Sequence, residues 1–303
     1  MAALGDVTLS TLDRPLTAGE LTAALGEYDV ICSTVTDVLS AAVWPETVRT
    51  RLLCNYGVGV NHIDLEGARA RGVVVTNTPD VLTEATAEVA LLLLLMIARR
   101  AGEGEREVRA GRWTGWRPAH LHGRSLDGKT VGVIGFGRIG QAFARKARFG
   151  LGMNVVYHSR NRASSEIEAE TGATYEPSLD ELIETADAIS LHCPGGPATH
   201  HLIDALRLAR MKPTAFLINT ARGTVVDEAA LIDALRSGSI GGAGLDVFEA
   251  EPKVPAALIA LENVVLLPHI GSATVETRLE MGLRAAENLE AFLEGREPRD
   301  RVV

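Results

Sequence analysis

Cysteines and long apolar runs are scarce in this sequence, and both absences narrow the class of protein. Among 303 residues there are only three cysteines, Cys32, Cys54 and Cys193, odd in number and far apart. Their spacing fits neither a disulfide framework nor a zinc site, so we expect no metal and a reducing, cytoplasmic location. The longest apolar run, Val89 to Ala98, has ten residues, which is too few to cross a bilayer.

A surplus of basic residues is also absent. The chain has 30 lysines and arginines against 39 aspartates and glutamates, and its formal net charge is -9. Binding to nucleic-acid phosphates or to anionic lipid needs a broad basic face, so we expect neither a nucleic acid nor a membrane as partner. Any anionic ligand must therefore meet a local cluster of positive groups.

What the sequence does contain is an alternation of apolar and helical stretches, which predicts an α/β fold. A first series places short strands at residues 6–10, 29–35, 50–57 and 72–78, with a helix at residues 21–28. A second series predicts six strands, at residues 130–135, 154–158, 187–192, 214–219, 242–247 and 263–267. Six strands joined by helical crossovers predict a doubly wound parallel sheet.

Two long segments indicate how these series are joined. The run at residues 89–98 predicts a helix that is buried on all sides, and the polar residues 99–129 predict a crossover with a helix and an extended arm. The amphipathic segment from residue 275 has no partner strand, so we expect it to pack on the first domain. We therefore predict a discontinuous first domain, residues 1–97 with 275–303, and a second domain at residues 98–274.

A glycine-rich turn opens the second series. In "TVGVIGFGRIGQ", Gly135, Gly137 and Gly140 lie between an apolar strand and a helix. In a dinucleotide site the first glycine permits a tight turn, the second lets the backbone approach the pyrophosphate, and the third allows the helix to pack closely on the strand. This context predicts binding of a dinucleotide at the amino terminus of the helix.

The stretch "VVYHSRNR" after this turn indicates which dinucleotide is bound. An NAD site usually has a carboxylate here that bonds the ribose 2'-hydroxyl. This sequence has none, and instead offers Ser159, Arg160 and Arg162, which could bind a 2'-phosphate. A charge-assisted contact contributes about 1.5 to 3 kcal/mol, so we expect NADPH to be preferred and NADH to be the weaker cofactor.

Three ionisable residues follow three separate strands of the second series. They are Arg222, Glu251 and His269, and the ends of parallel strands meet at one edge of a sheet. Arginine binds a carboxylate, histidine can donate a proton, and glutamate can hold the histidine ring in its charged form. Together these types fit reduction of a 2-oxo acid, although each alone could be structural: Arg222 paired with Asp227, His269 buried, Glu251 solvated.

Several motifs of the chain resemble one family of enzymes along nearly its whole length. They are "NYGVGVNHID", "NTPDVLTEATAE", "GRWTGWRP", "VGVIGFGRIGQ", "INTARGTVVDEAAL", "GLDVFEAEP" and "LLPHIGSAT". The sequence is similar to the D-isomer-specific 2-hydroxyacid dehydrogenases, and within them to the glyoxylate/hydroxypyruvate reductases. The resemblance implies two Rossmann-like lobes, with the nucleotide domain inserted into a smaller flavodoxin-like substrate domain and hinges near residues 97 and 275.

The resemblance also implies roles for individual residues. Arg222 would anchor the substrate, Glu251 would orient the histidine, and His269 would donate the proton. Asp246 would hold the nicotinamide carboxamide. Further cofactor contacts would come from Arg138, Ile139, Thr220 and Ala221, and further substrate contacts from Val58, Gly59 and Ser272.

Members of this family are usually dimers, joined through the nucleotide domain and the arm. Here the arm contains Trp113 and Trp116. In some of these reductases an aromatic residue near the end of the arm shapes the partner subunit's pocket, and His120 is the nearest candidate in this chain. The resemblance thus implies a homodimer and leaves open which size of substrate is preferred.

The function that the sequence predicts is NADPH-preferring reduction of glyoxylate to glycolate and of hydroxypyruvate to D-glycerate. One alternative within the same chemistry is a dehydrogenase for a bulkier keto acid, of the 2-ketogluconate or phenylpyruvate type. An alternative of a different class is a nucleotide-sensing corepressor-like binding protein, because fold alone does not determine function. Catalytic turnover separates these classes.

Overall fold

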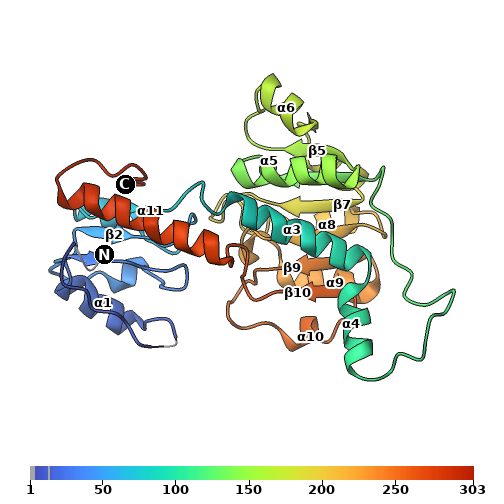
Figure 1. Ribbon diagram of the computed structural model, residues 1–303, viewed down its shortest axis with the longest axis horizontal. Helices are drawn as coiled ribbons and strands as arrows, with labels where there is room; N and C mark the ends of the chain where they lie inside the picture. The colour runs from blue at the N-terminus through green and yellow to red at the C-terminus, as the bar shows by residue number, and fades with distance from the viewer. Residues whose placement is uncertain (1–3, 13) are drawn as a thin grey trace. The chain divides into compact units, whose positions relative to one another are not determined.

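The computed structural model describes residues 4–12 and 14–303, which fold into two compact units (Figure 1). The first unit comprises Met1–Leu82 and Ala273–Val303, and the second comprises Thr83–Ser272. The first unit is therefore discontinuous in sequence. The expected boundaries at residues 97 and 275 differ from this division, chiefly because helix α3 (Thr83–Ala98) packs on the sheet of the second unit.

The second unit is built on a parallel sheet of seven strands in the order β10-β9-β8-β7-β4-β5-β6. This is the doubly wound arrangement, with the reversal of strand order between β4 and β7. The strands are β4 (Thr130–Ile134), β5 (Asn154–His158), β6 (Ala173–Tyr175), β7 (Ala188–Leu191), β8 (Phe216–Asn219), β9 (Gly242–Leu245) and β10 (Val264–Leu266).

Two strand predictions need correction. The sheet has one strand more than expected, because the three-residue β6 adds to the edge beside β5. The expected strand at residues 6–10 does not form, and Val7 and Leu9 are exposed there. β6 is an edge strand and residues 6–10 are exposed, so both segments have few buried side chains that could create a pattern.

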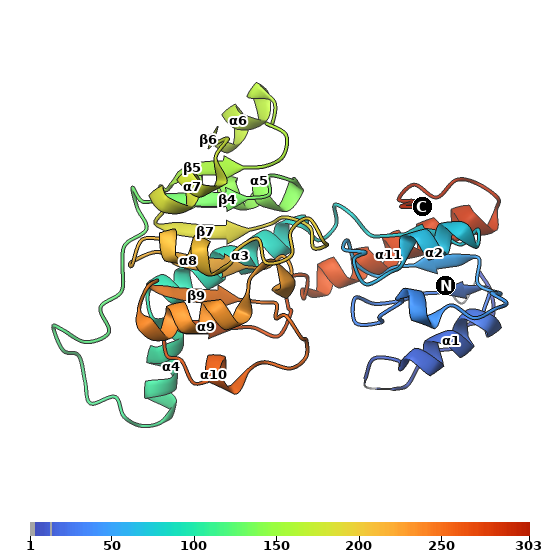
Figure 2. The ribbon, with the colours of Figure 1, turned by 180° about the vertical axis from the view of Figure 1, so that it is seen from behind.

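Helices cover both faces of the sheet. On one face lie α3 and α5 (Arg138–Arg145), the latter continued by a π-helical turn, η2 (Lys146–Gly150) (Figure 1). The opposite face carries α7 (Leu179–Thr185), α8 (Ala205–Arg210) and α9 (Glu228–Ser237) (Figure 2). Alternate strand residues belong to the two cores, as with Leu217 on one side and Ile218 on the other.

Helix α3 supplies much of one core, with Ala87, Ala90, Leu93 and Leu94 fully buried. The prediction that this helix is buried on all sides was wrong, because Leu92 is 44% exposed in the single chain. The crossover that follows contains α4 (Ala101–Arg109) and a long arm without helix or strand as far as residue 129. No helix among the described residues is both long and apolar enough to cross a membrane.

The helix ends of the second unit follow from local sequence. Asp227 caps α9 by accepting a hydrogen bond from the Ala230 N–H at 3.0 Å, and Gly238 ends the helix in the left-handed conformation. Shorter helices, α6 (Ser165–Thr171) and α10 (Ala256–Ile259), and the 3-10 turn η3 (Gly223–Val225) complete the unit.

The first unit contains a parallel sheet of three strands, β1 (Val30–Ile31), β2 (Leu52–Cys54) and β3 (Val74–Thr76). Its core includes residues of α1 (Ala18–Glu27), η1 (Ala41–Val43) and α2 (Leu65–Ala70). The terminal helix α11 (Val275–Leu293) packs against β2, where Ala285 and Leu289 contact Leu52 and Cys54. The segment that the sequence left without a partner strand is therefore a covering helix of this unit.

Candidate active site

The candidate site of the second unit lies where the parallel strands end. β4 ends before the glycine-rich turn, β8 ends three residues before Arg222, and β9 ends directly before Asp246. Because β8 pairs with both β7 and β9, the loops that follow them start side by side. This is the edge at which open α/β sheets bind their ligands.

The glycine-rich turn has the geometry that its spacing predicted. Gly135 has a φ of 92°, and a Cβ atom on it would lie 2.5 Å from the backbone nitrogen of Cys193. A Cβ atom on Gly140 would lie 2.2 Å from the carbonyl oxygen of Gly135. A Cβ atom on Gly137 would meet no atom within 4 Å. The first and third glycines thus permit close packing, while the second faces open space.

This open space fits a dinucleotide. Arg138 and Ile139 form the first turn of α5, so the free N–H groups of its amino terminus adjoin Gly137. The Oγ1 atom of Thr220 is buried and has no hydrogen-bond partner among the described residues, a state that a ligand can relieve. Ala221 next to it is buried as well. The residues present therefore fit a nicotinamide dinucleotide.

In the polar turn after β5, the two arginines that the sequence predicted to bind one phosphate have different surroundings. Arg160 is exposed and makes no hydrogen bond or ion pair with the rest of the described chain. Arg162 forms a two-pronged ion pair with Glu168, with Nε–Oε1 and Nη2–Oε2 distances of 2.8 Å. Ser159 donates its hydroxyl to the carbonyl oxygen of Asn161 at 2.5 Å.

Sequence reasoning did not identify Glu168, which fixes this turn. Its carboxylate also accepts a hydrogen bond from the Tyr157 hydroxyl at 2.7 Å, and that hydroxyl accepts one from the Ala163 N–H at 2.9 Å. The hydrogen bond from Arg162, followed by that from Tyr157, lowers the pKa of Glu168 to about 2. The available signal in the sequence was that Arg162 lies six residues before Glu168. At this distance a basic side chain in the loop can reach an acidic side chain in the helix that follows.

His269 and Glu251, which the sequence predicted to act together, are in contact in the structure. His269 Nδ1 and Glu251 Oε2 lie 2.8 Å apart, and the two side chains are 32% and 30% exposed. The other carboxylate oxygen of Glu251 accepts a hydrogen bond from the Phe248 N–H at 3.0 Å. The ring is held through Nδ1, which leaves Nε2 for a ligand.

The charge of Glu251 is maintained by its neighbours. Burial alone would raise the pKa of this carboxyl group, but the hydrogen bond and charge of His269, the Phe248 N–H and the charge of Arg222 together lower it. Glu251 is therefore ionised at neutral pH.

Asp246 positions the loop that carries His269. Its Oδ1 and Oδ2 atoms accept hydrogen bonds from the N–H groups of Ile270 and Gly271, both at 2.8 Å, and its own carbonyl accepts from the His269 N–H at 2.9 Å. Burial raises the pKa of Asp246, and the two N–H donors oppose this. The sequence motifs did not predict this anchoring role, because the family resemblance implied only a contact of Asp246 with the nicotinamide carboxamide.

Arg222 is held at the start of η3 by its own neighbours. Its carbonyl accepts a hydrogen bond from Asn219 Nδ2 at 2.9 Å, and its guanidinium donates to the carbonyl of Ala221 at 2.7 Å. Burial lowers the pKa of Arg222 and the charge of Glu251 raises it. The guanidinium is thus a partly buried cation in the electrostatic field of Glu251.

The remaining predicted substrate residues are divided between the units. Ser272 is half-buried at the end of the second unit. Val58 and Gly59 follow β2 in the first unit, where their carbonyls accept hydrogen bonds from Asn77 and Asn55. Their N–H groups make no hydrogen bond to any other described residue.

His120 in the arm is engaged within its own chain. Its Nε2 atom lies 2.8 Å from Glu107 Oε2, and Arg117 lies 3.7 Å from the other oxygen of that carboxylate. Trp113 and Trp116 are 55% and 82% exposed. The arm therefore presents large aromatic surfaces, while His120 is tied to α4.

Comparison with known proteins shows the family to which the chain belongs. Residues 91–271 match the family model described as the D-isomer specific 2-hydroxyacid dehydrogenase, NAD binding domain. A glyoxylate reductase from Thermococcus litoralis is 47% identical over 288 residues, covering 94% of this chain and 86% of the relative.

Two solved structures are also similar. An NADPH-dependent glyoxylate/hydroxypyruvate reductase from Sinorhizobium meliloti, in complex with NADP and malonate, has a TM-score of 0.85 and 40% identity, covering 95% of this chain and 88% of that one. A D-lactate dehydrogenase from Aquifex aeolicus, complexed with NAD and lactic acid, has a TM-score of 0.82 and 32% identity, covering 90% and 85%.

A doubly wound sheet with a dinucleotide turn and an Arg, Glu and His set at its carboxyl edge defines an NAD(P)-dependent oxidoreductase. The chain belongs to the D-isomer-specific 2-hydroxyacid dehydrogenase family. The family that the sequence motifs indicated is therefore confirmed.

Proposed function

We propose that this protein reduces small 2-oxo acids, converting glyoxylate to glycolate and hydroxypyruvate to D-glycerate, with NADPH preferred over NADH. The observation that carries the proposal is the pairing of His269 Nδ1 with Glu251 at 2.8 Å in the electrostatic field of Arg222. A proton donor, a group that keeps it charged and a carboxylate anchor are what this reduction requires. The glyoxylate reductases among its relatives support the choice of substrate.

When bound, a reduced nicotinamide would supply the hydride for the carbonyl carbon. His269 gives the proton on Nε2 to the carbonyl oxygen as negative charge develops there. Glu251 fixes the ring through Nδ1 and so keeps Nε2 in place for the transfer. Arg222 pairs with the substrate carboxylate and draws electron density from the carbonyl.

Further contacts with the substrate and the cofactor are assigned to other residues near the ends of the strands. We assign the N–H groups of Val58 and Gly59 to the substrate carboxylate, with Ser272 as an additional donor. Thr220 Oγ1 and Ala221 are assigned to the nicotinamide. Gly135, Gly137, Gly140, Arg138 and Ile139 are assigned to the pyrophosphate. Asp246 still has lone pairs for the nicotinamide carboxamide besides those that accept from Ile270 and Gly271.

The preference for NADPH rests on the turn after β5. Arg160 is exposed and uncommitted among the described residues, so it is the first candidate to pair with a 2'-phosphate. Ser159 can redirect its hydroxyl to the same group. Arg162 is committed to Glu168 and would contribute mainly through its charge. The Sinorhizobium meliloti reductase, whose structure is a complex with NADP, supports this preference.

A homodimer is part of the proposal. Trp116, at 82% exposure, and Trp113 lie on the arm, and exposed aromatic residues are enriched in protein interfaces. Sedimentation equilibrium of the purified protein measures this directly. A mass of twice 32.2 kDa is expected, and a single-chain mass at micromolar concentration would exclude the dimer.

The function is tested by initial rates of NADPH oxidation with glyoxylate and with hydroxypyruvate, each repeated with NADH. Fast turnover with NADPH and slower turnover with NADH is the expected result. Turnover confined to phenylpyruvate or 2-ketogluconate would replace the small substrate with a bulky one. Absence of turnover with all four acids would overturn the enzymatic proposal.

A further inference from the structure

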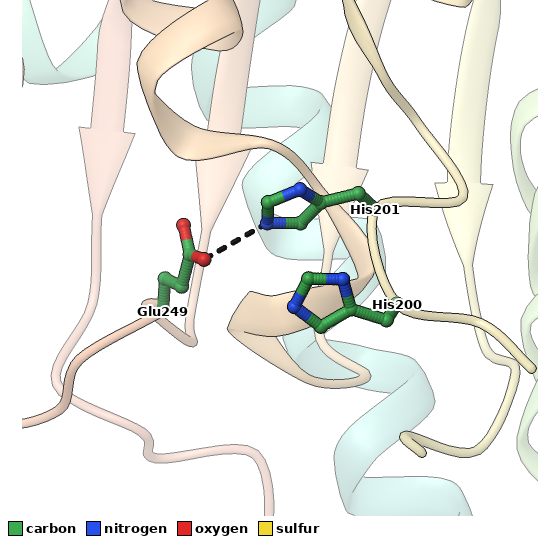
Figure 3. Close-up of side chains that lie close together, drawn as sticks. All are labelled: His200, His201 and Glu249. Carbon is green, nitrogen blue, oxygen red and sulfur yellow. Dashed lines mark hydrogen bonds and ion pairs between the residues drawn. The ribbon is translucent and has the colours of Figure 1, made fainter. Parts of the chain in front are cut away.

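A group of three side chains outside the catalytic set lies at the carboxyl edge of the sheet. His200 and His201 belong to the loop after β7, and Glu249 belongs to the loop after β9 (Figure 3). In Figure 3 both imidazole rings extend from their loop toward the carboxylate of Glu249. None of the three has a role in the reduction proposed above.

The three ligand atoms are already close together. One ligand atom from each residue lies within 4.8 Å of the other two, and His201 Nε2 is 2.8 Å from Glu249 Oε1. Tetrahedral zinc holds its nitrogen and oxygen ligands at about 2.0 to 2.2 Å, which separates the ligands from each other by roughly 3.4 Å. Small side-chain rotations would therefore bring all three atoms onto one ion.

The backbone holds the two histidines in this arrangement. The rings of His200 and His201 stack with centroids 4.0 Å apart, so both present their edges to the same side. The His201 N–H donates to the carbonyl of Thr224 at 2.8 Å, and His201 has a φ of 48°, in the left-handed region. The loop is thus fixed at the residue that bears the second ligand.

The charge of the surroundings favours a cation. Glu228 lies beside Glu249 and accepts a hydrogen bond from its N–H at 3.4 Å. A second carboxylate therefore lies close to the three ligand residues. A divalent cation bound to Glu249 would also be attracted by the negative charge of Glu228.

We propose that His200, His201 and Glu249 form a binding site for a divalent transition-metal ion of the zinc type. Two imidazole nitrogens and one carboxylate oxygen suit zinc, nickel or copper, whereas magnesium and calcium select oxygen ligands. Water would complete the coordination, because the three residues leave at least one position open. The ion would tie the loop after β7 to the loop that carries Glu251.

The test is titration of the purified, untagged full-length protein with Zn²⁺ in competition with a chromophoric chelator. One ion per chain is expected at this site. His200→Ala and Glu249→Gln should each weaken binding at least tenfold, because losing a ligand costs no less than the about 10–100-fold loss seen for outer-shell partners. Excess Mg²⁺ should not compete. His200 is exposed, so its removal leaves the core intact.

Two matched variants keep the result specific. His122→Ala removes an exposed histidine of the arm, and His269→Ala removes the histidine of the other His–Glu pair at this edge. Both should bind Zn²⁺ as the unchanged protein does. Binding that survives in His200→Ala but disappears in His269→Ala would place the ion at the catalytic pair and overturn the proposal. If Zn²⁺ does not bind with a dissociation constant below about 1 mM, the weak end of specific metal sites, the proposal is wrong. His201 and Glu249 would then form only an ion pair between two loops.

Discussion

At the scale of single residues, the contributions of His269 and Glu251 to the rate can be separated. His269 is expected to donate the proton, whereas Glu251 is expected to hold the histidine ring through one hydrogen bond. His269→Ala removes the proton donor, and general acid catalysis contributes about 10²–10⁴-fold to rate. Glu251→Gln keeps a hydrogen-bonding side chain but removes the charge, so its loss should be smaller. The measurement is kcat for glyoxylate reduction at saturating NADPH.

Cofactor affinity is the control for these two variants. Neither side chain belongs to the groups assigned to the dinucleotide, so NADPH binding followed by fluorescence should stay within about twofold, or roughly 0.4 kcal/mol. A His269→Ala protein with unchanged kcat would remove this residue from the mechanism. Equal losses in kcat and cofactor affinity would point instead to a misfolded site.

The two arginines after β5 make a second comparison at this scale. Arg160→Ala should raise KM for NADPH about 10- to 100-fold and leave KM for NADH nearly unchanged, because only NADPH carries the 2'-phosphate. Arg162→Ala should have a smaller effect, since Glu168 already holds this guanidinium. KM from initial rates with both cofactors measures the difference.

Glu168→Gln is the matched variant for this pair. It weakens the hold on Arg162, so affinity for NADPH should stay the same or increase. If Arg160→Ala instead impairs both cofactors equally, the arginine stabilises the turn and does not select the phosphate.

At the scale of elements, the effect of a glycine substitution at the junction of β4 and α5 depends on which glycine is changed. Gly140→Ala would place a methyl group 2.2 Å from the Gly135 carbonyl oxygen and separate helix from strand. Overpacking of this kind destabilises a protein by about 1–3 kcal/mol. Urea unfolding should show this loss of stability.

Gly137→Ala is the counterpart, because its added methyl group meets no atom within 4 Å. Stability should change by less than about 0.5 kcal/mol, as for a surface substitution. NADPH affinity should nevertheless fall, since the methyl group enters the space assigned to the pyrophosphate. A Gly137→Ala protein with full cofactor affinity would contradict that assignment.

At the scale of the whole molecule, we expect folding stability to depend on pH through His192. Burial lowers the pKa of this ring to about 3, against about 6.5 in an unfolded chain. Between these values the unfolded state binds a proton that the folded state excludes, so stability falls as pH drops below 6.5. At pH 5 the loss amounts to about 2 kcal/mol relative to pH 7.

Urea midpoints at pH 7 and pH 5 measure this effect, with His192→Gln as reference. The unchanged protein should lose about 2 kcal/mol more than the variant over this interval. The carboxyl groups with lowered pKa values, such as Glu251, lose their contribution only in stronger acid. An equal pH dependence in both proteins would show that His192 is not the group responsible.

Local pattern was sufficient for some of these features and insufficient for others. The turn at Gly135, the strand before it and the helix after it are adjacent in sequence, so their spacing alone predicted their geometry. The short strand β6 and the exposed Leu92 were missed, because a three-residue segment has no period and an apolar run does not show which side meets solvent. The sequence prediction also placed helix α3 in the first domain, because an apolar run does not show on which sheet the helix packs.

Sequence motifs were enough to establish the family and the dinucleotide turn, and to predict Arg222, Glu251 and His269 as catalytic residues, because each motif is continuous and chemically distinctive. Tertiary structure decided which side chains meet across loops: Arg162 with Glu168, Asp246 with the His269 loop, and His201 with Glu249 from 48 residues away. The physical reason is that parallel strands deliver distant loops to one edge. The contacts made there depend on strand order and register, which spacing along the chain does not specify.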